Sequence, residues 1–92
     1  MSRSIEHNTA QQRFQWREDG QLCVLDYELR DGVMVVTHTG VPQSVGGRGI
    51  AADLAKAALD TARARGWKLR PLCSYVEAYM RRQRGAYDDL LA

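Results

Sequence analysis

The sequence predicts an α/β (α+β) fold in which an antiparallel meander of strands is followed by a helix, one more strand and a second helix. Two Asp-Gly pairs, at residues 19–20 and 31–32, separate three strand-like segments, and Asp-Gly is a strong hairpin signal. A glycine-rich stretch at 43–49 then runs directly into an alanine-rich segment whose apolar residues recur at helical spacing.

The first three strands are predicted at residues 11–17, 22–29 and 33–38, where apolar residues alternate with polar ones or cluster in a β-branched run. The second strand places four apolar side chains on one face: Cys23, Leu25, Tyr27 and Leu29. Residues 39–42 are expected to end the third strand, because proline has no N–H to donate to a sheet.

The first helix is predicted from Arg48 onward, with Gly66 as the residue that stops it. Its expected buried positions are Ile50, Leu54, Ala57, Ala58 and Ala62. A further strand is expected over 67–73 and a second helix from about Tyr75 to Gln83, followed by a terminal turn over 87–91.

The second predicted helix has a recognisable start and an apolar face. Ser74 is expected to be its N-cap, because Glu77 three residues later completes the capping-box pattern. The side chains that this helix is expected to bury are those of Val76, Tyr79 and Met80.

The length and composition predict one domain over residues 1–92. The chain is 45% hydrophobic and 26% charged, which is typical of a soluble globular protein. It contains no apolar run near the ~20 residues of a membrane span and no signal peptide at its start. We therefore expect a cytoplasmic protein that does not enter a membrane.

The formal net charge of +2 is too small to require a nucleic-acid partner. Basic residues do form two clusters, which suit either solvated helix faces or a phosphorylated small molecule. No aromatic platform is interleaved with them, so a nucleic-acid-binding domain is a minor hypothesis. The clusters are Arg63, Arg65, Lys68 and Arg70, and Arg81, Arg82 and Arg84.

The two cysteines, Cys23 and Cys73, have neither CxxC spacing nor a companion histidine cluster. This pattern predicts no zinc site and no disulfide framework. In a cytosolic protein both are expected to be free thiols. Cys23 has only a structural interpretation.

Three of the eight glycines lie within residues 46–49. Such a loop in front of a helix can direct backbone N–H groups at an anion, aided by the positive end of the helix dipole. The alternative is a flexible turn that only caps the helix.

The loop also fits the dinucleotide pattern G-x-G-x-x-(G/A), but no acidic residue follows about 20 positions later and the preceding strands form hairpins rather than a parallel unit. The G-K-(S/T) sequence of nucleoside triphosphate loops is absent.

Three segments together resemble the small single-domain branch of the GNAT acetyltransferases. They are His38-Thr39-Gly40-Val41-Pro42, Arg48-Gly49-Ile50-Ala51 with the glycines before it, and Pro71-Leu72-Cys73-Ser74-Tyr75-Val76. They are similar to the H-T-x-V-P, R-G-x-G-I-(A/G) and P-x-C-x-(Y/F)-V motifs of that branch, and the resemblance covers roughly residues 12 to 88.

The resemblance implies a GNAT-like fold that binds acetyl-CoA, with the pyrophosphate on backbone amides of the glycine loop and no metal. The implied cofactor-binding residues are Val45, Gly46, Gly47, Arg48, Gly49, Ile50 and Ala51. Two residues depart from the family pattern. Gly46 stands where Gln or Arg is usual, and Gly40 stands where a Glu is common.

The resemblance also implies catalytic roles for His38 and Cys73. His38, at a strand end beside the loop, has the right ordinary pKa for a general base, although such a histidine can equally be a structural hydrogen-bonder. Cys73 can accept the acetyl group as a thioester, with His38 assisting, or can line a site where the amine attacks directly. Ser74 and Tyr79 are supporting candidates: Ser74 as a helix cap, and Tyr79 as a packing residue or as the acid that protonates the leaving thiolate.

The leading hypothesis is therefore an N-acetyltransferase that uses acetyl-CoA as co-substrate and an unidentified amine, on a small molecule or a protein, as acceptor. The alternative is a non-catalytic CoA-binding or interaction module with the same fold, which the departures at Gly40 and Gly46 favour.

Overall fold

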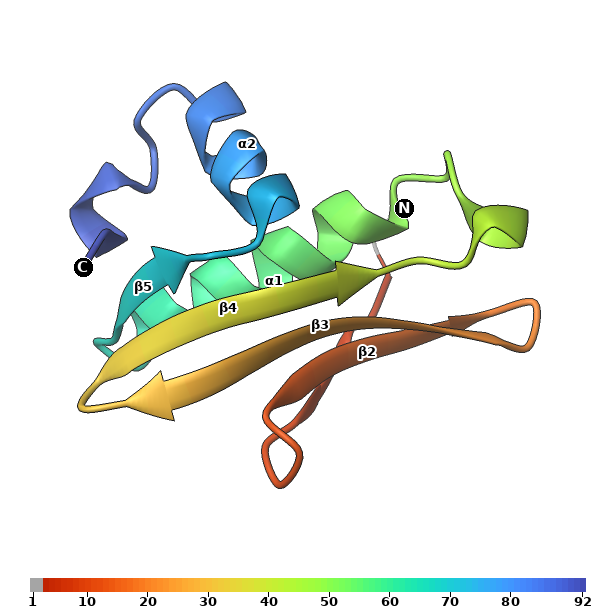
Figure 1. The fold of residues 1–92 in the computed structure, drawn as a ribbon, viewed down its shortest axis with the longest axis horizontal. Coiled ribbons are helices and arrows are strands. Elements are labelled where there is room, and N and C mark those ends of the chain that lie inside the picture. Colours follow the sequence, from red (N-terminus) through yellow and green to blue (C-terminus); the bar gives the residue numbers. More distant parts are fainter. Residues whose placement is uncertain (1–2) are drawn as a thin grey trace.

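The computed structural model describes residues 3–92 and contains one five-stranded sheet with two α-helices (Figure 1). The strands lie in sequence order; the first four are antiparallel, and the last pair is parallel. The elements are β1 (Glu6–Asn8), β2 (Arg13–Glu18), β3 (Gln21–Arg30), β4 (Val33–Gly40), the 3₁₀ turn η1 (Gln43–Val45), α1 (Ile50–Ala64), β5 (Lys68–Pro71), α2 (Ser74–Arg82) and the 3₁₀ turn η2 (Asp88–Leu90).

Both predicted Asp-Gly hairpins are confirmed. Asp19 and Gly20 have φ angles of 49° and 75°, and Asp31 and Gly32 have φ angles of 51° and 77°. Two consecutive residues with positive φ are the mark of the type I′ turn, whose twist matches that of the flanking strands. The β2–β3–β4 meander therefore follows directly from local sequence.

The short first strand, β1, was not expected from the sequence. Its three residues are polar and carry no alternating pattern, so only its contacts explain it. The His7 ring stacks on Phe14 with a centroid distance of 4.2 Å, and His7 Nε2 lies 2.7 Å from the Tyr27 hydroxyl. Tertiary contacts therefore add this edge strand to the meander.

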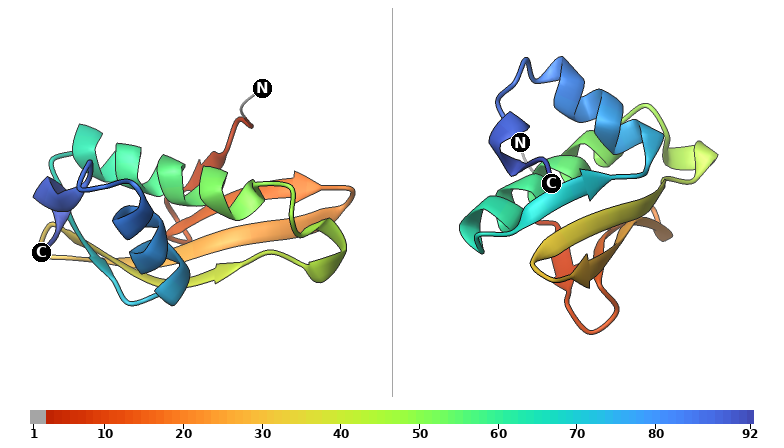
Figure 2. Two further views of the ribbon diagram at one scale, coloured as in Figure 1. Left: turned by 90° about the horizontal axis from the view of Figure 1, so that it is seen from above. Right: turned by 60° about the vertical axis from the view of Figure 1, so that its left-hand side comes forward.

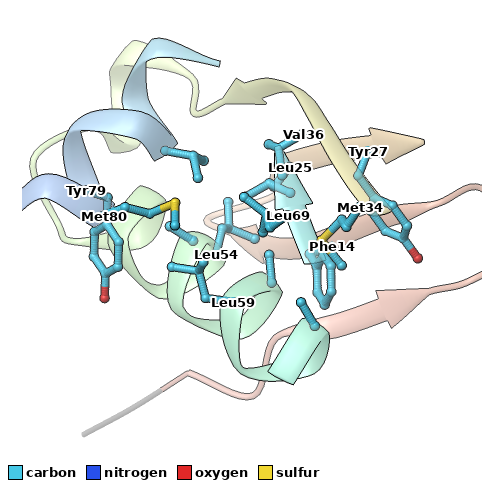
Figure 3. Packing of buried hydrophobic residues seen from close by; sticks show 14 of the residues in the cluster. Phe14, Leu25, Tyr27, Met34, Val36, Leu54, Leu59, Leu69, Tyr79 and Met80 are labelled. Atoms are coloured by element: carbon cyan, nitrogen blue, oxygen red, sulfur yellow. The ribbon is translucent and has the colours of Figure 1, made fainter. Parts of the chain in front are cut away.

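The core lies between α1 and one face of the sheet, and α2 closes it beside β5 (Figures 2 and 3). Leu25, Met34 and Leu69 from the sheet and Leu54 from α1 are fully buried. The helix also buries Ala55 and Leu59, which the sequence pattern did not single out, whereas Ala57 is only half-buried. As predicted, α2 buries Val76, Tyr79 and Met80.

Helix α1 ends as the sequence predicts. Gly66 has a φ of 70°, its N–H donates to the Arg63 carbonyl, and the Trp67 N–H donates to the Ala62 carbonyl at 2.8 Å. This is the Schellman arrangement, which turns the chain sharply into β5.

Helix α2 does not start as predicted. Ser74 is its first helical residue rather than its cap, and Cys73 occupies the N-cap position with extended backbone angles. Glu77 therefore lies one position too late for a capping box. The prediction was wrong because the exit of the chain from β5, rather than the best capping side chain, sets where the helix starts. Strand β4 likewise continues to Gly40 instead of ending at His38.

None of the helices in residues 3–92 is long and apolar enough to cross a membrane.

Candidate active site

The parallel strands β4 and β5 separate halfway along β4. They pair from Val33 with Lys68 to Val36 with Pro71, and the N–H groups of Leu72 and Cys73 both donate to the Val36 carbonyl. From Thr37 to Gly40, β4 pairs with no strand other than β3 within the described part of the chain. The result is a split in the sheet, with the backbone edge of β4 free to bind an extended chain (Figure 1).

A bulge in β4 sets the directions of the side chains at the split. Tyr27 pairs with Val36 but Asp26 pairs with His38, so Thr37 is an extra residue in β4. After the bulge, Thr39 lies opposite the fully buried Leu25 and therefore points to the helix side. His38 lies opposite Asp26 and points to the other face of the sheet.

Cys73 lies on the helix side of the split, at the N-cap of α2. Its Sγ atom lies 3.3 Å from the Thr39 hydroxyl across the split. Partial burial raises the pKa of the Cys73 thiol, but the Thr39 hydroxyl and the backbone N–H groups of Val76, Tyr75 and Thr39 together outweigh burial and lower its pKa below 9.0. Cys73 is the N-cap residue of α2 and its side chain makes no capping hydrogen bond, so the helix contributes the positive end of its dipole, which favours the thiolate.

His38 is exposed on the opposite face of the sheet. Its ring lies along β4 over Gly40: a Cβ atom built on Gly40 would lie 2.8 Å from His38 Nε2. The His38 side chain makes no hydrogen bond to any residue between 3 and 92, and the Cys73 thiol bonds to Thr39 instead. The structure therefore brings His38 and Cys73 to the same split but on opposite faces, without direct contact.

The glycine loop follows β4 after η1 and leads into α1. Gly47 and Gly49 have φ angles of 78° and 83°, which only glycine adopts readily. Hydrogen bonding within α1 begins only at the N–H of Asp53, which donates to Gly49. A run of backbone N–H groups before it has no acceptor in residues 3–92: those of Gly47, Arg48, Gly49, Ile50, Ala51 and Ala52. Consecutive free N–H groups at a helix start are a ready anion site.

A profile of the GCN5-related N-acetyltransferases matches residues 13–90, which contain the split, the loop and both helices. The chain belongs to this family.

The chain is also similar to several known proteins. Protein NATD1 of mouse and Protein NATD1 of human are each 36% identical to the chain over 80 residues, covering 84% of it and 73% and 71% of their own lengths. A solution structure of a GCN5-like candidate N-acetyltransferase from Staphylococcus aureus has the same fold, with a TM-score of 0.72 and 25% identity over 97% of this chain and 87% of its own.

In this member of the GCN5-related N-acetyltransferase family the loop residues divide into two groups. The side chains of Val45 and Ile50 are buried in the core, each only 1% exposed, so they anchor the loop ends. The N–H groups of Val45 and Gly46 donate to the carbonyls of Pro42 and Gln43, so neither belongs to the free amides. Gly46 to Gly49 are exposed. The Arg48 guanidinium turns away from the free amides and binds the carboxylates of Glu18 and Asp19, at 3.1 and 2.8 Å.

The two departures from the family pattern have different surroundings. A Cβ atom on Gly46 would lie 3.3 Å from the backbone oxygen of Gln43, so a larger residue there requires a small shift of η1. A Cβ atom on Gly40 would meet only the mobile end of the His38 ring. The absent side chain at Gly40 therefore allows His38 to fold back along β4.

The supporting candidates differ in position. Ser74 is exposed on the first turn of α2. Tyr79 is 8% exposed in the core, and burial raises the pKa of its hydroxyl, whose charged neighbours include Lys56 and Asp60 on α1. Its hydroxyl points away from the packed side chains, and the ring fills the space between α2 and α1 (Figure 3). These contacts favour the packing role for Tyr79.

The basic clusters are distributed over separate contacts. Arg63 binds Asp89, Arg81 binds Glu77, and Lys68 donates to the Asp89 carbonyl. Arg65 and Arg82 lie over the rings of Trp67 and Tyr75. Most of these cations thus have partners within the protein.

Sequence reasoning missed Thr39 as a site residue. Its hydroxyl is the side-chain partner of the Cys73 thiol, yet Thr39 stands 34 positions away in the sequence. Its place in the H-T-x-V-P segment was the available signal.

Proposed function

We propose that this protein transfers an acetyl group from acetyl-CoA to an amine. The observation that carries this proposal is the continuity of the free backbone groups: the unpaired edge of β4 leads through η1 into the free N–H groups of the glycine loop. A CoA molecule has matching chemistry along its length, with an extended arm containing two amides and then a pyrophosphate.

The arm of acetyl-CoA would bind in the split between β4 and β5 by pairing with the β4 edge, as an added strand does. The pyrophosphate would then lie on the loop amides at the start of α1. The thioester would reach the closed end of the split, near Cys73 and Thr39 on one face and His38 on the other.

Direct transfer needs one base. The amine nitrogen attacks the thioester carbonyl carbon, the bond from that carbon to the CoA sulfur breaks, and CoA leaves as its thiolate. The proton released by the attacking amine passes to His38, whose exposed face of the sheet is open to the acceptor.

A covalent route uses Cys73 first. Its thiolate attacks the thioester carbon and CoA thiolate leaves, which forms an acetyl thioester on Cys73. The amine then attacks that thioester and restores the thiol. In this route the α2 N-terminus and Thr39 activate the thiol, because His38 lies on the other face.

Incubation with acetyl-CoA followed by intact-mass measurement separates the two routes. The covalent route predicts an added acetyl group that disappears in Cys73→Ala. Direct transfer predicts no adduct, with acetylation of an amine panel intact in Cys73→Ala. In direct transfer, where His38 is the base, His38→Gln should lower kcat by about 10²- to 10⁴-fold and leave the KM for acetyl-CoA almost unchanged.

The second candidate is a non-catalytic CoA-binding module, which Gly40 and Gly46 favour because both remove a side chain that the family commonly has. Calorimetry with CoA would then show binding while no amine of the panel is acetylated. If calorimetry detects no binding of CoA or acetyl-CoA, both the acetyltransferase and the CoA-binding module are excluded. We place the protein in the cytoplasm, where its two free cysteines would stay reduced.

A further inference from the structure

A cluster of charged side chains lies on the outer side of the glycine loop. It joins three segments that are far apart in the sequence: the N-terminal segment, the tip of the β2–β3 hairpin, and the loop with the first turn of α1. We call it the loop clamp, and its members are Arg3, Glu18, Asp19, Arg48 and Asp53.

The central contact of the loop clamp is to the loop backbone. Arg3 donates from one guanidinium nitrogen to the Arg48 carbonyl oxygen at 3.0 Å, and from the other to Asp53 at 2.6 Å. In a trans peptide group the carbonyl and the following N–H point in opposite directions. Fixing the Arg48 carbonyl on the outer side therefore directs the Gly49 N–H inward, to the side of the free amides.

Glu18 connects this contact to the sheet. It accepts hydrogen bonds from the Trp16 indole at 2.8 Å and from Arg48 at 3.1 Å, and Arg3 lies 3.7 Å away. The Trp16 and Arg48 hydrogen bonds are the main causes that lower the pKa of Glu18. Since Trp16 packs against the core, Glu18 is a fixed point at the end of β2.

We propose that Arg3 and Glu18 are positioning residues that hold the glycine loop in its pyrophosphate-binding arrangement. The inference rests on the proposed function of the loop as the seat of the CoA pyrophosphate. A loop with three glycines in four positions loses much conformational entropy when it becomes ordered. Contacts that order it before the ligand arrives strengthen binding of the phosphate part of the ligand alone.

A comparison of two acetyl donors distinguishes a specific role of the loop clamp in phosphate binding from a general effect on the structure. Acetyl-CoA contains the pyrophosphate, whereas S-acetylpantetheine contains only the arm and the thioester. Arg3→Ala and Glu18→Gln should raise the KM for acetyl-CoA by about three- to tenfold and leave its kcat unchanged. The kcat/KM for S-acetylpantetheine should not change, and Arg3→Lys should restore part of the loss.

Arg13→Ala is the matched control. Arg13 forms an ion pair with Asp26 at 2.7 Å, with side chains 31% and 28% exposed, on β2 and β3 away from the loop. The Arg13→Ala substitution removes the same charge and a comparable ion pair. It should therefore change thermal stability about as much as Arg3→Ala without changing the KM for acetyl-CoA.

Several results would overturn the inference. One is an unchanged KM for acetyl-CoA in Arg3→Ala; another is an equal loss for both substrates, which indicates general damage. A third is a lower KM for acetyl-CoA in Glu18→Gln, which would show that the carboxylates keep Arg48 away from the phosphates instead of holding the loop.

Backbone order parameters test the loop clamp even if wild-type protein binds no CoA, a result that would overturn the proposed function. The N–H groups of Gly47 and Gly49 should have lower NMR order parameters in Arg3→Ala than in wild type and Arg13→Ala, because the variant loses the hydrogen bond that fixes the Arg48 carbonyl. Equal order parameters in all three proteins would overturn the clamp itself.

Discussion

The two halves of β4 follow one another in a single strand but differ in their surroundings. From Val33 to Val36 the strand is paired on both edges, and Met34 and Val36 are fully buried. From Thr37 to Gly40 it is paired on one edge only, and its side chains are exposed or half-buried. The closed half contributes to stability, whereas the open half leaves backbone groups free for a ligand.

The two cysteines show the same contrast. Cys23 lies beneath α1 with no exposed surface, and burial raises the pKa of its thiol. Cys73 lies at the open half, where a helix start and a hydroxyl lower its pKa in spite of partial burial. One residue type therefore packs in the core in one region and lies where its thiolate is favoured in the other.

The largest expected effect is on the closed half. Leu69 pairs with Met34 and is fully buried, so Leu69→Ala should lower the free energy of unfolding by about 2–5 kcal/mol. Urea unfolding measures it, with Leu72→Ala as the control. Leu72 is 65% exposed just past the end of β5, and its removal should change stability by less than about 0.5 kcal/mol. Similar losses for both variants would contradict the contrast between the two halves.

Cys73 should react with an alkylating reagent at least about ten times faster than Cys23. Iodoacetamide should alkylate Cys73 in the native protein and spare Cys23, as measured by peptide mass spectrometry at pH values from about 6 to 9. The folded pKa of Cys73 lies below 9.0, so its reaction should accelerate at lower pH than that of an unfolded thiol.

The same shift has a defined effect on stability. The Cys73 thiolate contributes stability that is fully present above pH 9.0 and is lost as the pH falls through the folded pKa. Faster alkylation of Cys23 than of Cys73 in native protein would refute this assignment of the two environments.

A smaller effect should follow from Thr39→Val, which keeps the shape of the side chain and removes the hydroxyl 3.3 Å from the Cys73 sulfur. Without that hydroxyl, which can donate to the sulfur once the thiol is ionised, the pKa of Cys73 should rise, and alkylation near neutral pH should slow several-fold. The free energy of unfolding should change by less than about 1.5 kcal/mol. Thr37→Val is the control, since Thr37 Oγ1 bonds to the Asp26 carbonyl instead. Equal slowing in both variants would exclude a specific role for Thr39.

The smallest effect is expected for Gly40→Ala. The added methyl group would lie 2.8 Å from His38 Nε2 and should turn the flexible ring away from β4. Stability should change by no more than about 1 kcal/mol, because Ala suits a strand better than Gly. The His38 ring signals in NMR should shift while those of His7, stacked on Phe14, stay in place as the internal control. An unmoved His38 signal would show that the ring does not lie over Gly40 in solution.

Local sequence signals predicted most of the fold. The Asp-Gly pairs predicted both hairpins, and Gly66 predicted the end of α1. The glycine loop predicted a helix start with free amides, although α1 begins at Ile50 rather than at Arg48. These features depend on residues within a few positions of one another, so a single sequence is enough to infer them. The family motifs added His38 and Cys73, whose catalytic roles stay predictions.

Long-range contacts decided the rest of the fold and of the candidate site. Strict alternation along β4 would place His38 on the same face as Met34 and Val36, but the bulge at Thr37 moves it to the opposite face, away from Cys73. Ser74 has the better side chain for a cap, yet the path of the chain from β5 puts Cys73 at that position.

What the sequence by itself determined is therefore the order of the elements and the glycine loop, because turn chemistry and helix periodicity act locally. Only the tertiary structure decided which side chains meet at the split and what holds the loop from outside. Thr39 with Cys73 and Arg3 with Arg48 are 34 and 45 positions apart, and such pairs form only when strand register and packing bring their segments together.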